Sequence, residues 1–163
     1  MNYSDVRILH GLSIATLVLS IVGIGSSLIG VGCMAIASVH FSSEDFLMYA
    51  SSALETIIDS GSTSEIYTYE LYDYGLSGLL SMIAPFFDIC AAAFLIEAVL
   101  YVVPLVAALQ GNYHCDEPEN LGIAFGFSIA GAIVEFLLGN IVTCILLIVM
   151  CIYINRLRKT VRS

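Results

Sequence analysis

Lysine and arginine are absent from most of this chain. All five basic side chains lie near the two ends, so positions 8–155 contain neither residue. Hydrophobic residues make up 59% of the chain and charged residues 12%, whereas a soluble domain is roughly 25% charged. A chain of this composition has too few polar side chains to cover its apolar ones in water. We therefore predict an all-α, multi-pass integral membrane protein.

Three apolar segments follow one another along the chain. Segment A spans 12–37, segment B spans 76–109 and segment C spans 121–154. Each exceeds the roughly 20 residues that a helix needs to cross a hydrocarbon core about 30 Å thick. We predict a bundle of three long transmembrane helices in a single membrane domain, 1–163. Its other parts are an acidic connection at 38–74, a short loop at 110–120 and a basic tail at 155–163.

The basic tail indicates the orientation of the helices. Four basic residues follow segment C directly, and Lys or Arg beside a transmembrane helix marks the cytoplasmic side. We expect a cytoplasmic C-terminus and, with three crossings, the loop 110–120 on the opposite side. The connection 38–74 would then also be inside, although its seven carboxylates and lack of basic residues are typical of an outside segment. The alternative is four crossings with segment B as a hairpin and both termini inside. Three crossings are favoured because segment B is short for two and has no Gly-rich turn.

The acidic connection contains two features of its own. Apolar residues recur at helical spacing from 43 to 60, opposite acidic residues, which predicts an amphipathic helix. The stretch 65–74 then combines tyrosines with acids. It is typical of a tyrosine belt at the membrane surface, or of a partner-binding surface for a basic protein, because tyrosine is enriched at binding hot spots. The predicted partner-binding residues are Glu65, Tyr67, Tyr69, Glu70, Tyr72, Asp73 and Tyr74.

Small residues recur every three or four positions along one face of each apolar segment. Such stripes let membrane helices approach each other closely. Segment C has a second small face, formed by Gly122, Gly126 and Ala130, and Gly126 lies about 180° from Glu135 around a helix. This second face can pack on another chain, so a homo-oligomer is one predicted assembly. The predicted helix-packing residues are Gly23, Ser27, Gly30, Ala84, Gly122, Gly126 and Gly131.

Three carboxylates fall inside the apolar segments: Asp88, Glu97 and Glu135. A charged side chain at the bilayer centre costs roughly 2.5–3.5 kcal/mol on insertion scales, and no basic residue of the same segments can pair with these acids. Each must be protonated, face water or a bound ion, or contact a partner protein. Asp88 and Glu135 lie on the small-residue stripes, which predicts the bundle interior. Glu97 lies nearer the depth of Glu135 than Asp88 does, and which acid is closer to Glu135 stays open.

The chain has no common catalytic or cofactor-binding motif. G-x-S-x-G, H-E-x-x-H, the P-loop and the dinucleotide fingerprint are all absent. The five cysteines include no C-x-x-C pair, and their odd number does not fit a disulfide framework. A net charge of −9 argues against nucleic-acid binding. We expect no enzymatic activity, no cofactor, no metal site and no nucleic-acid partner.

The stretch VPLVAALQG…EPENLGIAFGFSIAGAIV, at 103–134, resembles a group of small uncharacterised bacterial membrane proteins. In that group two Gly/Ala-rich helices flank a short loop, and the second helix opens with a Gly-Leu-Ala-Ile-Ala-Gly-like run. LGIAFGFSIAG corresponds to that run here. The loop is usually basic in that group and is acidic in this chain. The resemblance covers about a fifth of the chain. It implies paired membrane helices and no particular activity.

These features predict a non-enzymatic structural or accessory subunit of a membrane protein assembly. Its partners would be lipid and other membrane subunits, some with a basic surface, bound through small-residue helix faces and the acidic tyrosine-rich region. The alternative is an oligomeric proton or cation channel, or a transporter component, that uses the intramembrane acids. A third hypothesis is a membrane receptor or immunity-type protein for a basic peptide.

Overall fold

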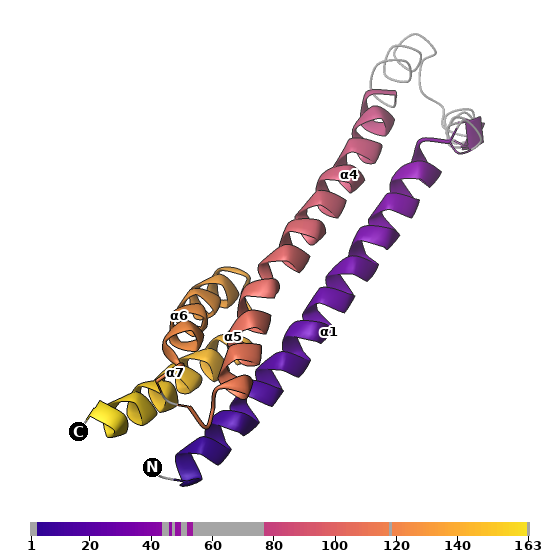
Figure 1. Ribbon diagram of the computed structural model, residues 1–163. Coiled ribbons are helices and arrows are strands. Elements are labelled where there is room, and N and C mark those ends of the chain that lie inside the picture. The colour runs from indigo at the N-terminus through magenta and orange to yellow at the C-terminus, as the bar shows by residue number, and fades with distance from the viewer. Residues whose placement is uncertain are drawn as a thin grey trace. The chain divides into compact units, whose positions relative to one another are not determined.

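The structure is a computed structural model that describes residues 3–43, 46, 48, 49, 52, 53, 77–117 and 119–162. Three stretches of the described chain are long and apolar enough to cross a membrane, and a shorter apolar helix accompanies them. This confirms the predicted all-α fold with three long apolar helices. In chain order the helices are α1 (Tyr3–Phe41), α4 (Ser77–Leu100), α5 (Val102–Tyr113), α6 (Gly122–Leu137) and α7 (Ile141–Arg162), as shown in Figure 1.

The chain divides into two compact units. Unit 1 comprises Met1–Leu28 and Leu95–Ser163, and unit 2 comprises Ile29–Phe94. Helices α1 and α4 each contribute to both units. The predicted amphipathic helix at 43–60 falls mostly outside the described residues, and the tyrosine-rich stretch at 65–74 falls wholly outside them.

The first two apolar segments form longer helical stretches than the sequence predicts. Helix α1 has 39 residues and extends past segment A at both ends. Helix α5 continues α4 through Tyr101, whose N–H donates to the carbonyl of Glu97 and whose carbonyl accepts from the N–H of Leu105. Both bonds have the spacing of an α-helix. Segment B is therefore not the hairpin that the four-crossing alternative required.

Segment C, predicted as one helix, is divided into α6 and α7. The chain reverses at Leu138–Asn140, where Gly139 has a φ of 77°, a conformation that glycine adopts without steric cost. The N–H of Asn140 donates to the carbonyl of Glu135 and closes the last turn of α6. The thiol of Cys144 donates to the carbonyl of Ala132 at 3.3 Å, so the two helices run antiparallel as a hairpin (Figure 1).

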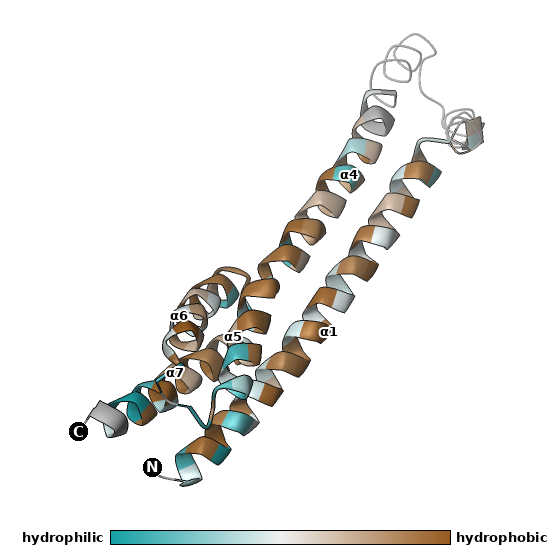
Figure 2. Ribbon diagram, in the orientation of Figure 1, coloured by the Kyte–Doolittle hydropathy of each residue, from teal (hydrophilic) through white to brown (hydrophobic). Residues whose placement is uncertain are grey.

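Because of this hairpin, the C-terminal end of α7 lies near the start of α6 and near the start of α1. The guanidinium of Arg158 near the C-terminus lies over the ring of Phe125 near the start of α6, 5.6 Å from its centroid. Hydrophilic residues of unit 1 gather at the start of α1, in the α5–α6 loop and at the end of α7 (Figure 2). A single hydrophobic cluster joins the same three places; it contains Val6, Leu9, Cys115, Leu121, Ala124, Met150, Ile154 and Leu157.

The α5–α6 loop and the basic tail therefore lie at the same end of unit 1. The prediction that they lie at opposite ends is wrong, because it assumed one continuous helix over 121–154. The tail itself is also helical, since α7 continues to Arg162.

Unit 2 is a pair of antiparallel helical stretches from α1 and α4. A Cβ at Gly30 would lie 3.0 Å from the ring of Phe94, so this glycine lets the two backbones approach. Further along, the hydroxyl of Ser38 donates to the carbonyl of Ala84 at 3.5 Å. The ring of Phe41 stacks on a phenylalanine of α4, Phe87, with centroids 5.2 Å apart.

The hairpin can be tested by thiol accessibility. In a variant without the native cysteines, Glu119→Cys and Thr160→Cys should react with an impermeant maleimide from the same side of the membrane. Ser42→Cys is the control and should react from the other side, because a single apolar helix, α1, separates it from the N-terminal end. Labelling of positions 119 and 160 from opposite sides would show that segment C crosses as one helix.

The native Cys115 is unsuited to this measurement. Its side chain is 8% exposed, and burial raises the pKa of its thiol above the ordinary value. The reactive thiolate therefore forms only at higher pH than for an exposed thiol. We expect Cys115 to react much more slowly with maleimide at neutral pH than a cysteine placed at the exposed position 119.

Candidate functional site

Helix α6 presents a stripe of small and polar residues to the interior of unit 1. Its buried residues are Ala124, Ser128, Gly131 and Glu135, which coincide with the stripe expected from the sequence. A Cβ at Gly131 would lie 3.2 Å from a methyl group of Leu147 on α7 and 3.4 Å from the Cα of Pro104 on α5. The absence of a side chain at Gly131 therefore lets α6 pack closely on both neighbours.

Glu135 is the acidic residue at the end of this stripe. Its side chain is 0% exposed, and neither carboxyl oxygen makes a hydrogen bond within the described part of the chain. Buried polar groups are nearly always hydrogen-bonded. An acid in this position is therefore the strongest indication of a functional group in the structure.

Tyr101 lies beside Glu135 at the junction of α4 and α5. The residue is 7% exposed, and its ring lies against the backbone of α1, where a Cβ at Gly23 would come within 2.6 Å of it. Its hydroxyl accepts a hydrogen bond from the side-chain amide of Asn140 in the α6–α7 turn. Tyr101 therefore connects α1, the α4–α5 junction and the hairpin turn.

Glu97 completes the cluster. It lies one helical turn before Tyr101 and is partly buried. Its carboxyl interacts electrostatically with both Tyr101 and Glu135. The structure thus answers the question left open by the sequence, because it brings Glu97 and Glu135 together. We refer to Glu97, Tyr101, Glu135 and Asn140 as the acid cluster.

Asp88 does not belong to the acid cluster. It lies in unit 2 and is exposed, so the prediction that it faces the bundle interior is wrong. The predicted stripe of segment B consists of the small residues at 77, 81, 84 and 91 together with Asp88, at alternating spacings of four and three. That spacing does not by itself identify the face that contacts a neighbouring helix.

The remaining predicted packing residues divide between buried and exposed positions. Ser27 is buried on α1 at 3% exposure, and Ala84 is half-buried. Gly122 and Gly126 lie on the exposed face of α6, and a Cβ at Gly126 would meet no atom within 4 Å. The first face of α6 therefore packs inside the protomer and the second stays uncovered.

Two members of the acid cluster were not anticipated. Tyr101 stands inside a long apolar segment without a pattern that distinguishes it. Asn140 follows Gly139, and this Gly-Asn pair is a turn signal. That pair was the one local indication of a break in segment C.

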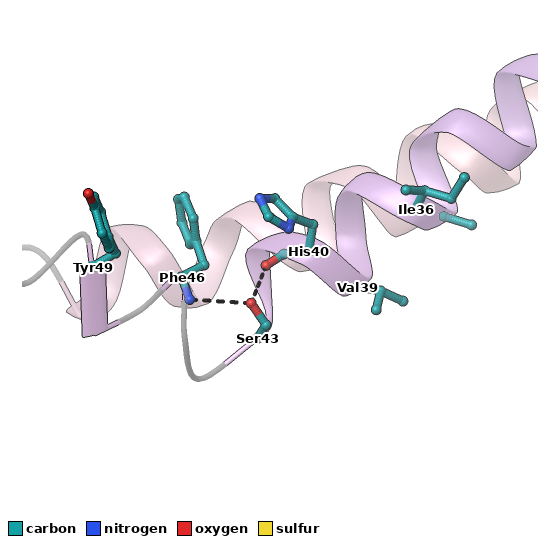
Figure 3. Close-up of a pocket in the computed structure, with 7 residues that line it drawn as sticks. Ile36, Val39, His40, Ser43, Phe46 and Tyr49 are labelled. Carbon is teal, nitrogen blue, oxygen red and sulfur yellow. Dashed lines mark hydrogen bonds between the residues drawn. The ribbon is translucent and has the colours of Figure 1, made fainter.

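An open apolar hollow lies at the end of α1 in unit 2 (Figure 3). The hydroxyl of Ser43 donates to the carbonyl of His40 at 2.7 Å and accepts from the N–H of Phe46 at 3.3 Å. Among the described residues that line it, the titratable side chains are those of His40 and Tyr49. This is a helix-terminating turn with aromatic side chains around it, and its described residues bring no set of chemical groups together.

Comparison with protein-family models, curated proteins and solved structures found no match to this chain. The resemblance of 103–134 to small bacterial membrane proteins therefore stays a prediction. The site has to be interpreted from its own geometry.

Replacing Tyr101 by phenylalanine tests the bond between the helix junction and the turn. Tyr101→Phe should lower the free energy of unfolding by about 1–2 kcal/mol, because it leaves the Asn140 amide without its acceptor in an apolar interior. The measurement is reversible unfolding in mixed micelles. Tyr113→Phe removes a hydroxyl from a residue that is 82% exposed, and we expect no change for this control.

The close approach at Gly23 can be tested with a matched pair of alanine variants. Gly23→Ala should destabilise the protein by about 1–3 kcal/mol, because the new methyl group overlaps the ring of Tyr101. Gly25→Ala meets no atom within 4 Å. It should be neutral or slightly stabilising, since alanine favours helix. Equal stability of the two variants would contradict the packing described here.

Proposed function

We propose that this chain is a non-enzymatic, multi-pass integral membrane protein that acts as a structural subunit of a membrane protein assembly. The observation that carries the proposal is the two-sided character of α6. One face is buried against α5 and α7, and the opposite face, with Gly122, Gly126 and Ala130, is exposed.

The exposed face of α6 has the composition of a helix–helix contact. Its three small residues are spaced four apart, and Ile123, Ile129 and Ile133 beside them are 44–58% exposed. Small residues at this spacing let a second helix approach closely, and the flanking apolar side chains add van der Waals contact. A transmembrane helix of another subunit fits this surface.

The arrangement of charges supports an orientation with the tail in the cytoplasm. The start of α1 carries Arg7, and the end of α7 carries the other basic residues, at the same end of unit 1. Basic residues on one side of a membrane mark the cytoplasmic side. The acidic connection 38–74 follows the other end of α1, so it would face outside. There it could bind a basic partner through Glu65, Glu70 and Asp73, as the sequence predicts.

The alternative function is movement of protons or cations across the membrane. The observation that favours it is the acid cluster, since intramembrane acids commonly belong to ion pathways. Purified protein in liposomes separates the two functions. Dissipation of an imposed ion gradient, lost in Glu135→Gln, would favour the pathway. If the wild-type protein leaves the imposed gradient unchanged, the result favours the structural role.

Substitution on the exposed face of α6 tests the structural role. Gly126→Leu should reduce association about tenfold or more, because the side chain holds a partner helix away, while the protomer still folds. Native mass spectrometry of protein extracted from its own membrane in mild detergent measures this. Wild-type protein should appear in a complex heavier than the 17.5 kDa chain.

Gly32→Leu is the matched control. Gly32 is exposed on α1, and a Cβ there also meets no atom within 4 Å. It should leave the complex intact. The mass of the complex also distinguishes a second copy from a different subunit. A monomeric wild-type protein, or equal association of the two variants, would contradict the proposal.

A further inference from the structure

The acid cluster contains two carboxyl groups and no cation. No lysine or arginine occurs between positions 8 and 155. Two acids at close range without a counter-ion do not both ionise, because the charges repel and the apolar surroundings disfavour each of them. The pair therefore holds at least one proton.

Few other titratable groups occur on the helices around the cluster. Helix α4 carries Asp88, which is exposed, and Cys90. Helix α1 has no titratable side chain between His10 and Cys33, and α5 has none before Tyr113. On α6 the only one is Glu135 itself. Helix α7 contributes only the thiols of Cys144 and Cys151 and the phenol of Tyr153 before its basic end. The charge state of the cluster is thus decided among Glu97, Tyr101 and Glu135.

The geometry favours a proton over a metal ion as the ligand. Within the described residues, no three His, Cys, Asp or Glu side chains are grouped so that they could hold a metal. Glu135 offers two buried oxygens without partners. A hard cation such as Mg²⁺ or Ca²⁺ requires six or more oxygen ligands, whereas a proton requires one acid and one acceptor.

The two acids differ in how far their side chains are buried. Glu135 is fully buried, whereas Glu97 is only partly buried. Tyr101 interacts with both, and its oxygen accepts from Asn140. A phenol that already accepts one hydrogen bond keeps its own O–H proton free to donate to an acid. Tyr101 follows Glu97 by one helical turn and is bonded to Asn140, whose N–H donates to the carbonyl of Glu135. Tyr101 is therefore placed between the helical turns that carry the buried acid and the more exposed acid.

We propose that Glu135 and Glu97 form an exchangeable proton-binding site in the membrane interior, with Tyr101 as the relay between them. In one transfer, Glu135 gives its proton to the phenol oxygen of Tyr101 while Tyr101 gives its O–H proton to the Glu97 carboxylate. These two coupled transfers move one proton in net from Glu135 to Glu97. Glu135 becomes the carboxylate, Glu97 becomes the acid and Tyr101 stays neutral. The site does not depend on whether α6 binds a partner.

Infrared spectroscopy of the full chain in liposomes tests this site directly. A protonated carboxylic acid has a C=O stretching band separate from that of a carboxylate. We expect the wild-type protein to keep such a band at neutral pH and Glu135→Gln to lose it. Labelling glutamate with ¹³C should shift the band in the wild-type chain, which identifies a glutamic acid without any substitution. A band that persists in Glu135→Gln, or its absence from wild type, would overturn the proposal.

Exchange with D₂O tests the relay. The band should shift as deuterium replaces the carboxylic proton, and Glu97→Gln or Tyr101→Phe should slow that shift roughly tenfold or more. Asp88→Asn and Glu119→Gln are controls, because both acids are exposed, and should leave the rate unchanged. If Glu97→Gln and Tyr101→Phe both exchange at the wild-type rate, the relay is wrong.

Discussion

Close approach of helix backbones at small residues is the interaction on which unit 1 depends. A Cβ at Gly111 would collide with the methyl group of Met150 and lie 2.8 Å from the hydroxyl of Ser13, so α5, α7 and α1 meet at that point. Gly131 and Gly23 provide similar approaches for α6 and for Tyr101. Between lipid tails, helices gain little from burying apolar surface, so van der Waals contact at these positions decides which faces meet. The location of the glycines therefore determines which polar groups are brought together.

The reversal between α6 and α7 suits an apolar environment. Within the turn, the N–H groups of Leu138, Gly139, Asn140 and Ile141 all donate to backbone carbonyls, as is required where water is absent. Leu137 and Ile141 on either side of the turn are 78% and 68% exposed. An apolar turn with bonded N–H groups can remain among lipid chains. The basic tail and the acidic connection 38–74 gave conflicting indications of orientation in the three-crossing prediction. The hairpin removes this conflict, because it places the tail at the end of unit 1 where α1 begins.

The sequence predicts correctly which face of α6 is buried, but it does not predict where α6 ends. Spacing of small residues at 124, 128, 131 and 135 is a property of one helix, and local spacing is sufficient to identify it. The end of that helix depends on a single glycine in an apolar stretch, and hydropathy does not detect it. Counting along the helices predicts that Glu97 lies nearer than Asp88 to the depth of Glu135. The pairing of Glu97 with Glu135 depends in addition on which faces of α5 and α6 pack together, and counting does not identify those faces. Asp88 shows the same limit, since it lies on a regular stripe and is exposed, whereas Ala84 and Ala91 of that stripe are half-buried.

Tyr101 links the packing of the protein to the chemistry of its acids. Its ring needs the space at Gly23, and its hydroxyl needs the amide of Asn140. The carboxyls of Glu97 and Glu135 both interact electrostatically with the same phenol. A change of charge at Glu135 would alter the hydrogen bonding of this phenol, and the phenol cannot move without disturbing α1 or the turn. Protonation of the acid cluster and the arrangement of α1, α5 and the hairpin are therefore energetically coupled. Because binding free energies are reciprocal, any partner that prefers one arrangement of these helices must also change the affinity of Glu135 for its proton.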